Sequence, residues 1–162
     1  MGCGSGALSI RAALVWPQAQ VLGVDAWPPA YNYSQRMCEK NAESEGVAVR
    51  CRFQRGDANK LDFPDGRFDA VVSNYVYHNI TGADRQALLL ETLRVLKKGG
   101  VFALNDEMKP RLYGDMEAFA QKLRDMGYED VRLIDTATEA FGSCRRAAMM
   151  MLGASRMLVG RK

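Results

Sequence analysis

The sequence has little of what marks several common kinds of protein. It contains one histidine and four cysteines, and no two cysteines have CxxC spacing. We therefore expect no metal site and no disulfide framework, and we predict free thiols in a reducing, cytoplasmic compartment. No apolar run is long enough to span a membrane, and no signal peptide is visible. The chain itself is therefore expected to make no membrane contact.

Strong charge of either sign is also lacking. The formal net charge is +3, from 22 basic and 19 acidic residues. This balance is too mild to indicate a nucleic-acid partner, and most of the basic residues are scattered along the chain. With 162 residues and 48% apolar content, the chain is predicted to be one domain, 1–162, with a substantial core.

Apolar segments of two kinds alternate along the chain. Helices are predicted over 7–16, 33–46, 83–100 and 115–127, and strands over 20–27, 47–58, 68–74, 101–106, 128–136 and 155–162. The helix 83–100 has a leucine stripe, a basic last turn and a Gly-Gly stop, and the methionines at 149–151 are expected in the core. The alternation predicts a doubly wound, mostly parallel α/β sheet with an antiparallel last strand.

A glycine-rich loop, "GCGSGA", covers residues 2–7 and leads into the first predicted helix. Such a loop lets a ligand approach the backbone and presents free amides at a helix N-terminus. Taken alone, it does not separate a dinucleotide site from sites for other nucleosides.

Acidic and amide residues follow the loop at the ends of predicted strands. Asp25 ends the next strand, at the spacing of an acid that holds ribose hydroxyls, although it could instead cap a helix. Asp57 and Ala58 end the predicted strand 47–58 and could read an adenine edge, or form an ordinary turn. Asn74 ends a third strand.

Four segments, taken in order, resemble the class I S-adenosylmethionine-dependent methyltransferases. They are "GCGSGALS", "VLGVDAW", "QRGDANKLDFPDGRFDAVVSNYVYHNI" and "LRVLKKGGVFAL". The chain looks most like bacterial, small-molecule-type members of the methyltransferase domain 11/25 group. The resemblance covers about two thirds of the chain and implies a Rossmann-like fold, S-adenosylmethionine as cofactor and a small-molecule methyl acceptor.

The resemblance also implies roles for individual residues. The loop would wrap the methionine part of the cofactor, Asp25 would bind the ribose, and Asn74 and Tyr75 would lie beside the sulfonium. The full implied cofactor set is Gly2, Cys3, Gly4, Ser5, Gly6, Asp25, Ala26, Trp27, Asp57, Ala58, Asn74 and Tyr75.

Two features of the family are not present in the sequence. The family's loop follows a strand that ends in an acid, and N-terminal helices cover its substrate. We therefore expect that the first central strand, between those ending at Asp25 and Asn74, is missing. Without it, these two strands would lack backbone hydrogen-bond partners, so the domain is expected to be incomplete. Upstream residues could supply that strand, and a membrane contact as well.

The sequence indicates the methyl acceptor less clearly than the cofactor. His78 and Tyr75 are weak candidates for handling a proton, and packing in the loop is the more ordinary role for His78. The loop 105–115 could face the acceptor through Lys109, Arg111 and Tyr113. The atom methylated and the oligomeric state stay open.

Two other functions stay open as well. The same loop could serve a nicotinamide-dependent oxidoreductase. Alternatively, the chain could be a non-catalytic methyltransferase remnant that folds or binds without turnover.

Overall fold

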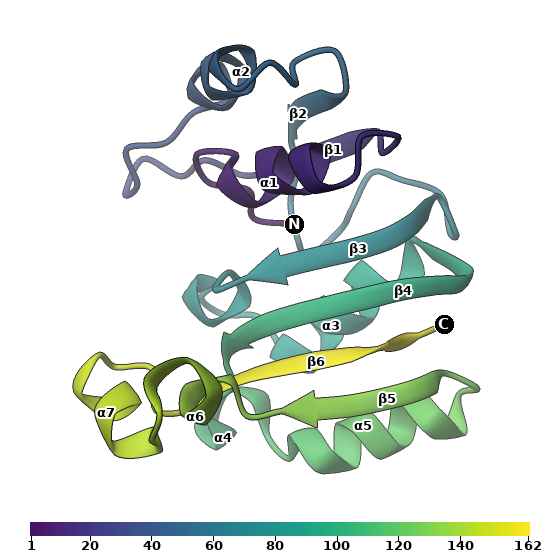
Figure 1. Cartoon of the computed structure of the whole chain (residues 1–162). Coiled ribbons are helices and arrows are strands. Elements are labelled where there is room, and N and C mark those ends of the chain that lie inside the picture. The colour runs from purple at the N-terminus through teal and green to yellow at the C-terminus, as the bar shows by residue number, and fades with distance from the viewer. The chain divides into compact units, whose positions relative to one another are not determined.

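The computed structural model describes residues 1–162, apart from the side chains of Phe141 and Cys144. The chain divides into two compact units, Met1–Lys60 and Leu61–Lys162. Each unit has a sheet of its own, one of two strands and one of four (Figure 1).

The first unit is a small α/β layer. Its elements are α1 (Ala7–Val15), β1 (Val21–Asp25), α2 (Gln35–Ser44) and β2 (Cys51–Arg55). The strands β1 and β2 run parallel, and α1 and α2 pack on them (Figure 1). The core consists of Ile10, Ala13, Cys38, Ala42, Val47, Cys51 and Phe53. The predicted strand 47–58 is shorter in the structure, because Val47 and Arg50 close a turn before it.

The second unit holds the longer sheet. Its elements are β3 (Phe68–Asn74), the 3-10 turn η1 (Tyr77–Asn79), α3 (Arg85–Arg94), β4 (Leu96–Glu107), α4 (Pro110–Tyr113), α5 (Met116–Asp125), β5 (Glu129–Ile134), α6 (Thr136–Phe141), α7 (Cys144–Met149) and β6 (Ser155–Arg161). The strand order is β3-β4-β6-β5 (Figure 1). β3 and β4 are parallel, whereas β6 is antiparallel to both of its neighbours. The predicted antiparallel last strand is confirmed.

The predicted helix 83–100 is wrong at its C-terminal end. Asp84 caps α3 through the amides of Gln86 and Ala87, as expected of an N-cap. The helix ends at Arg94, however, and residues 96–100 belong to β4. There the glycines serve a bulge against β3: a Cβ on Gly100 would lie 2.8 Å from a backbone oxygen. The Gly-Gly pair therefore shapes a strand and does not stop a helix.

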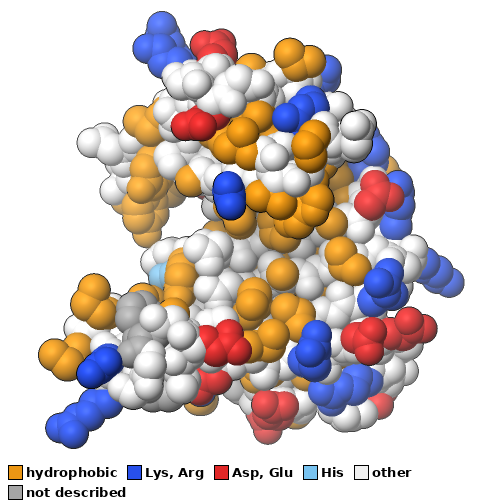
Figure 2. Space-filling model, in the orientation of Figure 1, with side chains coloured by type: hydrophobic (Ala, Val, Ile, Leu, Met, Phe, Trp, Pro, Cys, Tyr) orange, Lys and Arg blue, Asp and Glu red, His pale blue; other side chains and the backbone are white. Residues whose placement is uncertain are grey.

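The segment between β5 and β6 also differs from prediction. It forms α6 and α7, which the sequence did not indicate. Met149, Met150 and Met151 were expected in the core but are 83%, 66% and 77% exposed. Hydrophobic side chains are visible at the surface of this region in Figure 2.

The mixed α/β architecture agrees with the prediction, with one qualification about the sheet. The strands that end at Asp25 and Asn74, between which the family's first central strand was predicted to be missing, belong to different sheets in the described chain. Among the described helices, none is both long enough and apolar enough to cross a bilayer.

Candidate functional site

The glycine loop of the first unit runs through left-handed backbone at each glycine. Gly2, Gly4 and Gly6 have φ angles of 65°, 54° and 89°, a region that residues with a Cβ disfavour. The amides of Gly2 and Cys3 donate to the carbonyl of Val24 in β1, at 2.8 and 3.2 Å. The loop is thereby fixed against the C-terminal end of β1.

Asp25, the last residue of β1, holds the loop from the other side. Its Oδ2 accepts from the amide of Gly4 at 2.8 Å, and its Oδ1 accepts from the amide of Trp27 at 2.7 Å. The indole Nε1 of Trp27 donates to the carbonyl of Gly4 at 2.9 Å. Each carboxylate oxygen still has a lone pair. Asp25 can therefore hold the loop and accept hydroxyl donors at the same time.

The carbonyls of the loop are turned toward α2. Cys38 Sγ donates to the carbonyl of Gly4 at 3.1 Å, and Asn41 Nδ2 donates to that of Ser5 at 2.9 Å. Gly6 caps α1 with left-handed backbone, and no side chain of the described residues caps the helix. The first amides of α1 are therefore available to a ligand's carboxylate or other acceptor atoms.

The cysteines near the loop are suited to packing rather than to nucleophilic chemistry. Cys3, Cys38 and Cys51 are free thiols, as predicted, and the side chain of Cys144 lies outside the described residues. Burial is the main cause that raises the pKa of each of the three. They stay protonated near neutral pH, and a thiol is a poor nucleophile.

The predicted adenine-reading residues lie just after β2. Asp57 is exposed, and its Oδ1 accepts from the amide and the side chain of Asn59, at 2.9 and 2.8 Å. These bonds, the backbone one first, hold the pKa of Asp57 below its ordinary value. Ala58 is buried, whereas Ala26, after β1, is exposed. The adenine role of these residues stays a prediction.

Asn74 and Tyr75 belong to the second unit, where a closed polar network links the ends of three strands. Asn105 Nδ2 donates to Asn74 Oδ1 at 2.8 Å, and Thr136 donates to Asn105 Oδ1 at 2.9 Å. Ser155 Oγ lies 2.8 Å from the Thr136 hydroxyl and 2.7 Å from that of Tyr75. Because Thr136 gives its proton to Asn105, the proton order requires Tyr75 to donate to Ser155. The Tyr75 proton is therefore occupied within the protein.

The second unit also contains a cluster of hydrogen bonds around one buried carboxylate, which the sequence did not predict. Asp106, fully buried at the end of β4, accepts from His78 Nδ1 and from the amide of Glu107 through Oδ1. Its Oδ2 accepts from the amides of Val76 and Tyr77, at 3.1 and 2.7 Å. The carboxylate thus holds the η1 turn and the imidazole together. The one available signal was the acid at the end of the predicted strand 101–106.

The charge state of Asp106 follows from these contacts. Burial acts to raise its pKa, but the hydrogen bond and charge of His78, together with the Glu107 amide, bring the pKa below its ordinary value. Asp106 is therefore ionised near neutral pH, and an ionised carboxylate can only accept hydrogen bonds.

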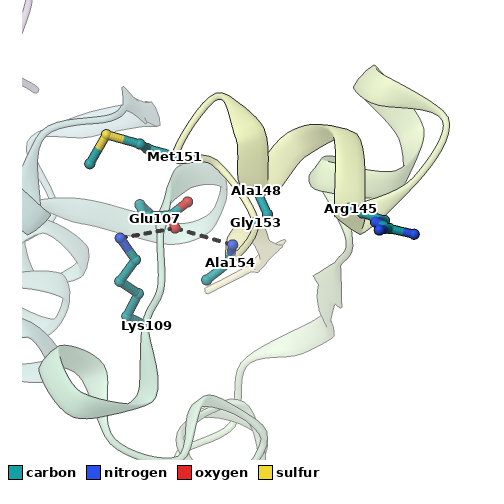
Figure 3. A pocket seen from close by; sticks show the side chains of 7 residues that line it. All are labelled: Glu107, Lys109, Arg145, Ala148, Met151, Gly153 and Ala154. Atoms are coloured by element: carbon teal, nitrogen blue, oxygen red, sulfur yellow. Dashed lines mark hydrogen bonds and ion pairs between the residues drawn. The ribbon is translucent and has the colours of Figure 1, made fainter.

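A pocket of about 650 Å³ lies beside β4 and α7 (Figure 3). Glu107 is 5% exposed at its side chain, and its Oε1 receives the amide of Ala154 at 3.1 Å and Lys109 Nζ at 3.4 Å. Its Oε2 is buried and has no hydrogen-bond partner among the described residues. The lining residues are Glu107, Lys109, Arg145, Ala148, Met151, Gly153 and Ala154.

The predicted acceptor loop is only partly suited to contact a ligand. Lys109 lines the pocket and Arg111 is exposed. Tyr113 is 2% exposed and so belongs to the core, which corrects its prediction as a surface contact. Burial first, and then the charge of Asp106, raises the pKa of Tyr113 well above its ordinary value.

A glycine loop that opens a helix, followed by a strand ending in an acid, defines the class of α/β proteins that hold a nucleoside. The family can be named more closely, because residues 1–104 match the model of the family described as "Methyltransferase domain". That match covers well over half of the chain, and the chain belongs to this family.

Individual relatives agree with the family. The chain is 38% identical over 100 residues to a demethylmenaquinone methyltransferase of Thermus thermophilus, a match over 62% of this chain and 42% of the relative. It thus spans less than half the length of that relative. A geranyl diphosphate methyltransferase solved with SAM has a TM-score of 0.72 at 14% identity, over 99% of this chain and 75% of its own.

The [4+2]-cyclase SpnF has the same fold, with a TM-score of 0.67 at 21% identity over 99% of this chain and 73% of its own. The fold is therefore shared by enzymes of different chemistry, and function has to be argued from the residues.

Proposed function

We propose that this chain binds S-adenosylmethionine and takes part in methyl transfer to a small molecule. The arrangement of Gly4, Asp25 and Trp27 carries the proposal. One carboxylate holds the loop at Gly4 and the turn at Trp27 and still has lone pairs for a ribose. Family membership selects methyl transfer among the functions that this fold supports.

The residues of the first unit fit this cofactor in kind. The left-handed glycines leave the loop without side chains, and the uncapped start of α1 offers amides to the carboxylate of the methionine part. Trp27 provides an aromatic face for a base, while its indole N–H is held by Gly4. When bound, the cofactor would supply a methyl group already activated by its sulfonium, so the protein's task is alignment.

A small molecule is the acceptor class that we favour. The mild net charge does not suit nucleic acid. The demethylmenaquinone methyltransferase among the relatives acts on a small molecule by its name. Three free thiols support a reducing, cytoplasmic setting.

Family membership also argues against the alternatives. A nicotinamide-dependent oxidoreductase is disfavoured because the match is to the methyltransferase family, over a span that includes the loop, Asp25 and Asn74. A non-catalytic remnant would bind the cofactor without turnover, and so differs from our proposal only when transfer to an acceptor is measured.

Fluorescence offers a direct test, because the chain has two tryptophans and one of them is dispensable. Trp16 is 62% exposed, so Trp16→Phe leaves Trp27 as the sole reporter. Titration with S-adenosylhomocysteine should change the Trp27 emission to saturation, and isothermal calorimetry should give the same affinity. NAD is the matched control. A response to NAD alone would overturn the proposal.

A further inference from the structure

One oxygen of a buried carboxylate lacks a partner in the pocket beside β4 and α7. The side chain of Glu107 is 5% exposed, and its Oε1 receives the Ala154 amide at 3.1 Å and Lys109 Nζ at 3.4 Å. Its Oε2 is buried and has no hydrogen-bond partner among the described residues. A buried oxygen without a donor costs free energy, and native proteins contain few of them. A donor from a ligand would remove that cost.

The walls of the pocket offer this oxygen no side-chain donor. Ala148 and Gly153 have no polar side-chain group, and they lie close together, since a Cβ on Gly153 would be 3.1 Å from the Ala148 Cβ (Figure 3). Met151 is 77% exposed, and its unbranched side chain can move as a ligand donor approaches Oε2. The volume of about 650 Å³ is enough for a small molecule with an apolar chain.

The charges at the pocket restrict the kind of ligand. Lys109 Nζ has three N–H donors but contacts only Glu107 Oε1 among the described residues. Arg145 lines the same pocket, with its guanidinium directed away from Glu107 in Figure 3. Two cationic side chains and one carboxylate make the surroundings net positive, which disfavours a ligand that is only a cation. A ligand that is only an anion would leave Oε2 without a donor.

We propose that this pocket binds a small zwitterion with an apolar chain, of the chemical class of the α-amino acids. The ligand's ammonium group donates to Glu107 Oε2, and its carboxylate accepts from Lys109 Nζ, so each charge of the protein pair meets the opposite charge of the ligand. The apolar chain lies against Ala148 and Met151. This is a ligand site in addition to the one proposed around Asp25.

L-leucine is the probe, and the Ala154 amide is the reporter because it is bonded to the same carboxylate. In ¹H–¹⁵N correlation spectra of the full chain, L-leucine should shift the Ala154 resonance to saturation. Of two analogues, 4-methylpentanoate lacks the ammonium group and 3-methylbutylamine lacks the carboxylate. Each should bind at least about tenfold more weakly, as expected for losing a hydrogen bond to a charged group. No shift with L-leucine, or an analogue that binds as tightly, would overturn the proposal.

Two variants should change the selectivity of the pocket in opposite directions. Glu107→Gln removes the carboxylate but keeps its shape, so 4-methylpentanoate should bind more tightly than L-leucine. Lys109→Met removes the ammonium group beside Glu107, so 3-methylbutylamine should bind more tightly than L-leucine. Equal weakening of all three ligands in both variants would contradict the assigned contacts. If Glu107→Gln does not fold, Lys109→Met, at a side chain that is 35% exposed, and the titrations of the native chain decide.

Glu117→Gln is the matched control for charge. Glu117 is an exposed acid in the first turn of α5 and does not line the pocket. Its loss changes the net charge as much as Glu107→Gln does, and the order of the three affinities should stay as in the native chain. A changed order would mean that net charge, and not the pocket, sets the selectivity. None of these titrations contains S-adenosylhomocysteine, so either proposed site can fail while the other is retained.

Discussion

The carboxylate of Asp25 and the amide of Gly4 are joined by a 2.8 Å hydrogen bond across 21 positions of the sequence. This contact links the acid at the end of β1 to the middle of the glycine loop. A residue expected to serve the ligand is therefore also part of the frame that shapes the ligand's loop.

Asp25→Asn should weaken both functions. An amide NH₂ cannot accept from Gly4 or Trp27, so one backbone amide loses its partner. The unfolding free energy should fall by about 1–3 kcal/mol, together with the affinity for S-adenosylhomocysteine. Urea denaturation and calorimetry measure the two effects. Asp57→Asn, at an exposed turn, should cost less stability, and an equal loss in both variants would contradict this account.

Gly6→Ala tests the backbone of the loop. Gly6 has φ of 89°, and a Cβ there would lie 3.1 Å from the Phe53 ring and 3.3 Å from Cys38 Cβ. Gly46 has φ of 69° and open space around it. Both alanine variants should lose roughly 1–2 kcal/mol from the left-handed conformation. Gly6→Ala should lose more in urea denaturation because it also crowds the core, and equal losses would show that the packing is slack.

The ionisation of Asp106 predicts a loss of stability in acid. The pKa of Asp106 is lower in the folded chain than its ordinary value, so the unfolded chain takes up the proton first as the pH falls. The stability due to this carboxylate is present above about pH 4 and is lost as the pH falls through the folded pKa. Urea denaturation across this range should therefore show a steep acid limb that Asp106→Asn flattens.

Asp69→Asn is the control for that measurement. The pKa of Asp69 is also lowered, by its contacts with Lys97, but its side chain is 87% exposed and screened by water. This variant should leave the acid limb almost unchanged. An Asp69 variant that flattened the limb as much as the Asp106 variant would contradict the assignment.

Arg94 fastens the start of the second unit. Its guanidinium donates to Glu91 through Nε and Nη2, to the carbonyls of Phe63 and Leu61, and to Asp65. The single ammonium group of lysine cannot make all these bonds at once, whereas the planar guanidinium of arginine has five N–H donors. Arg94→Lys should reduce the unfolding free energy measured by urea denaturation, because most of these hydrogen bonds would be lost.

The exposed ion pair of Lys97 with Asp69 gives the comparison for Arg94. Lys97→Ala should cost less unfolding free energy than Arg94→Lys, because the charged groups of Lys97 and Asp69 are both exposed to water. Similar losses of unfolding free energy for Arg94→Lys and Lys97→Ala would mean that the Arg94 guanidinium adds no more stability than a surface ion pair.

Local patterns predicted much of the fold. The strand 68–74 was predicted with its observed bounds, because its apolar run is bounded by a turn and by Asn74. The helix 83–100 was extended too far because Lys-Lys-Gly-Gly is typical of a helix end, whereas here the second glycine lies against backbone of β3. That close approach is a tertiary contact that no local pattern records.

The candidate site, like the fold, was predicted only in part. The glycine loop and Asp25 follow each other at a characteristic spacing, so the cofactor residues could be proposed from sequence. Asp106 was read only as the end of a strand. Its partner, His78, lies 28 positions earlier, and only the parallel pairing of β3 and β4 brings the two together.

The two sheets are expected to differ in how well their backbone amides are protected from hydrogen exchange. β4 and β6 are each paired on both sides, whereas the glycine loop rests on a sheet of two strands. Small two-stranded sheets belong to the less protected parts of proteins, and doubly paired strands to the most protected. In hydrogen exchange, the amides of β4 and β6 should therefore be the slowest to exchange. A ligand of the glycine loop would be recorded chiefly as slower exchange in β1 and β2, so its binding would register as local folding of the first unit.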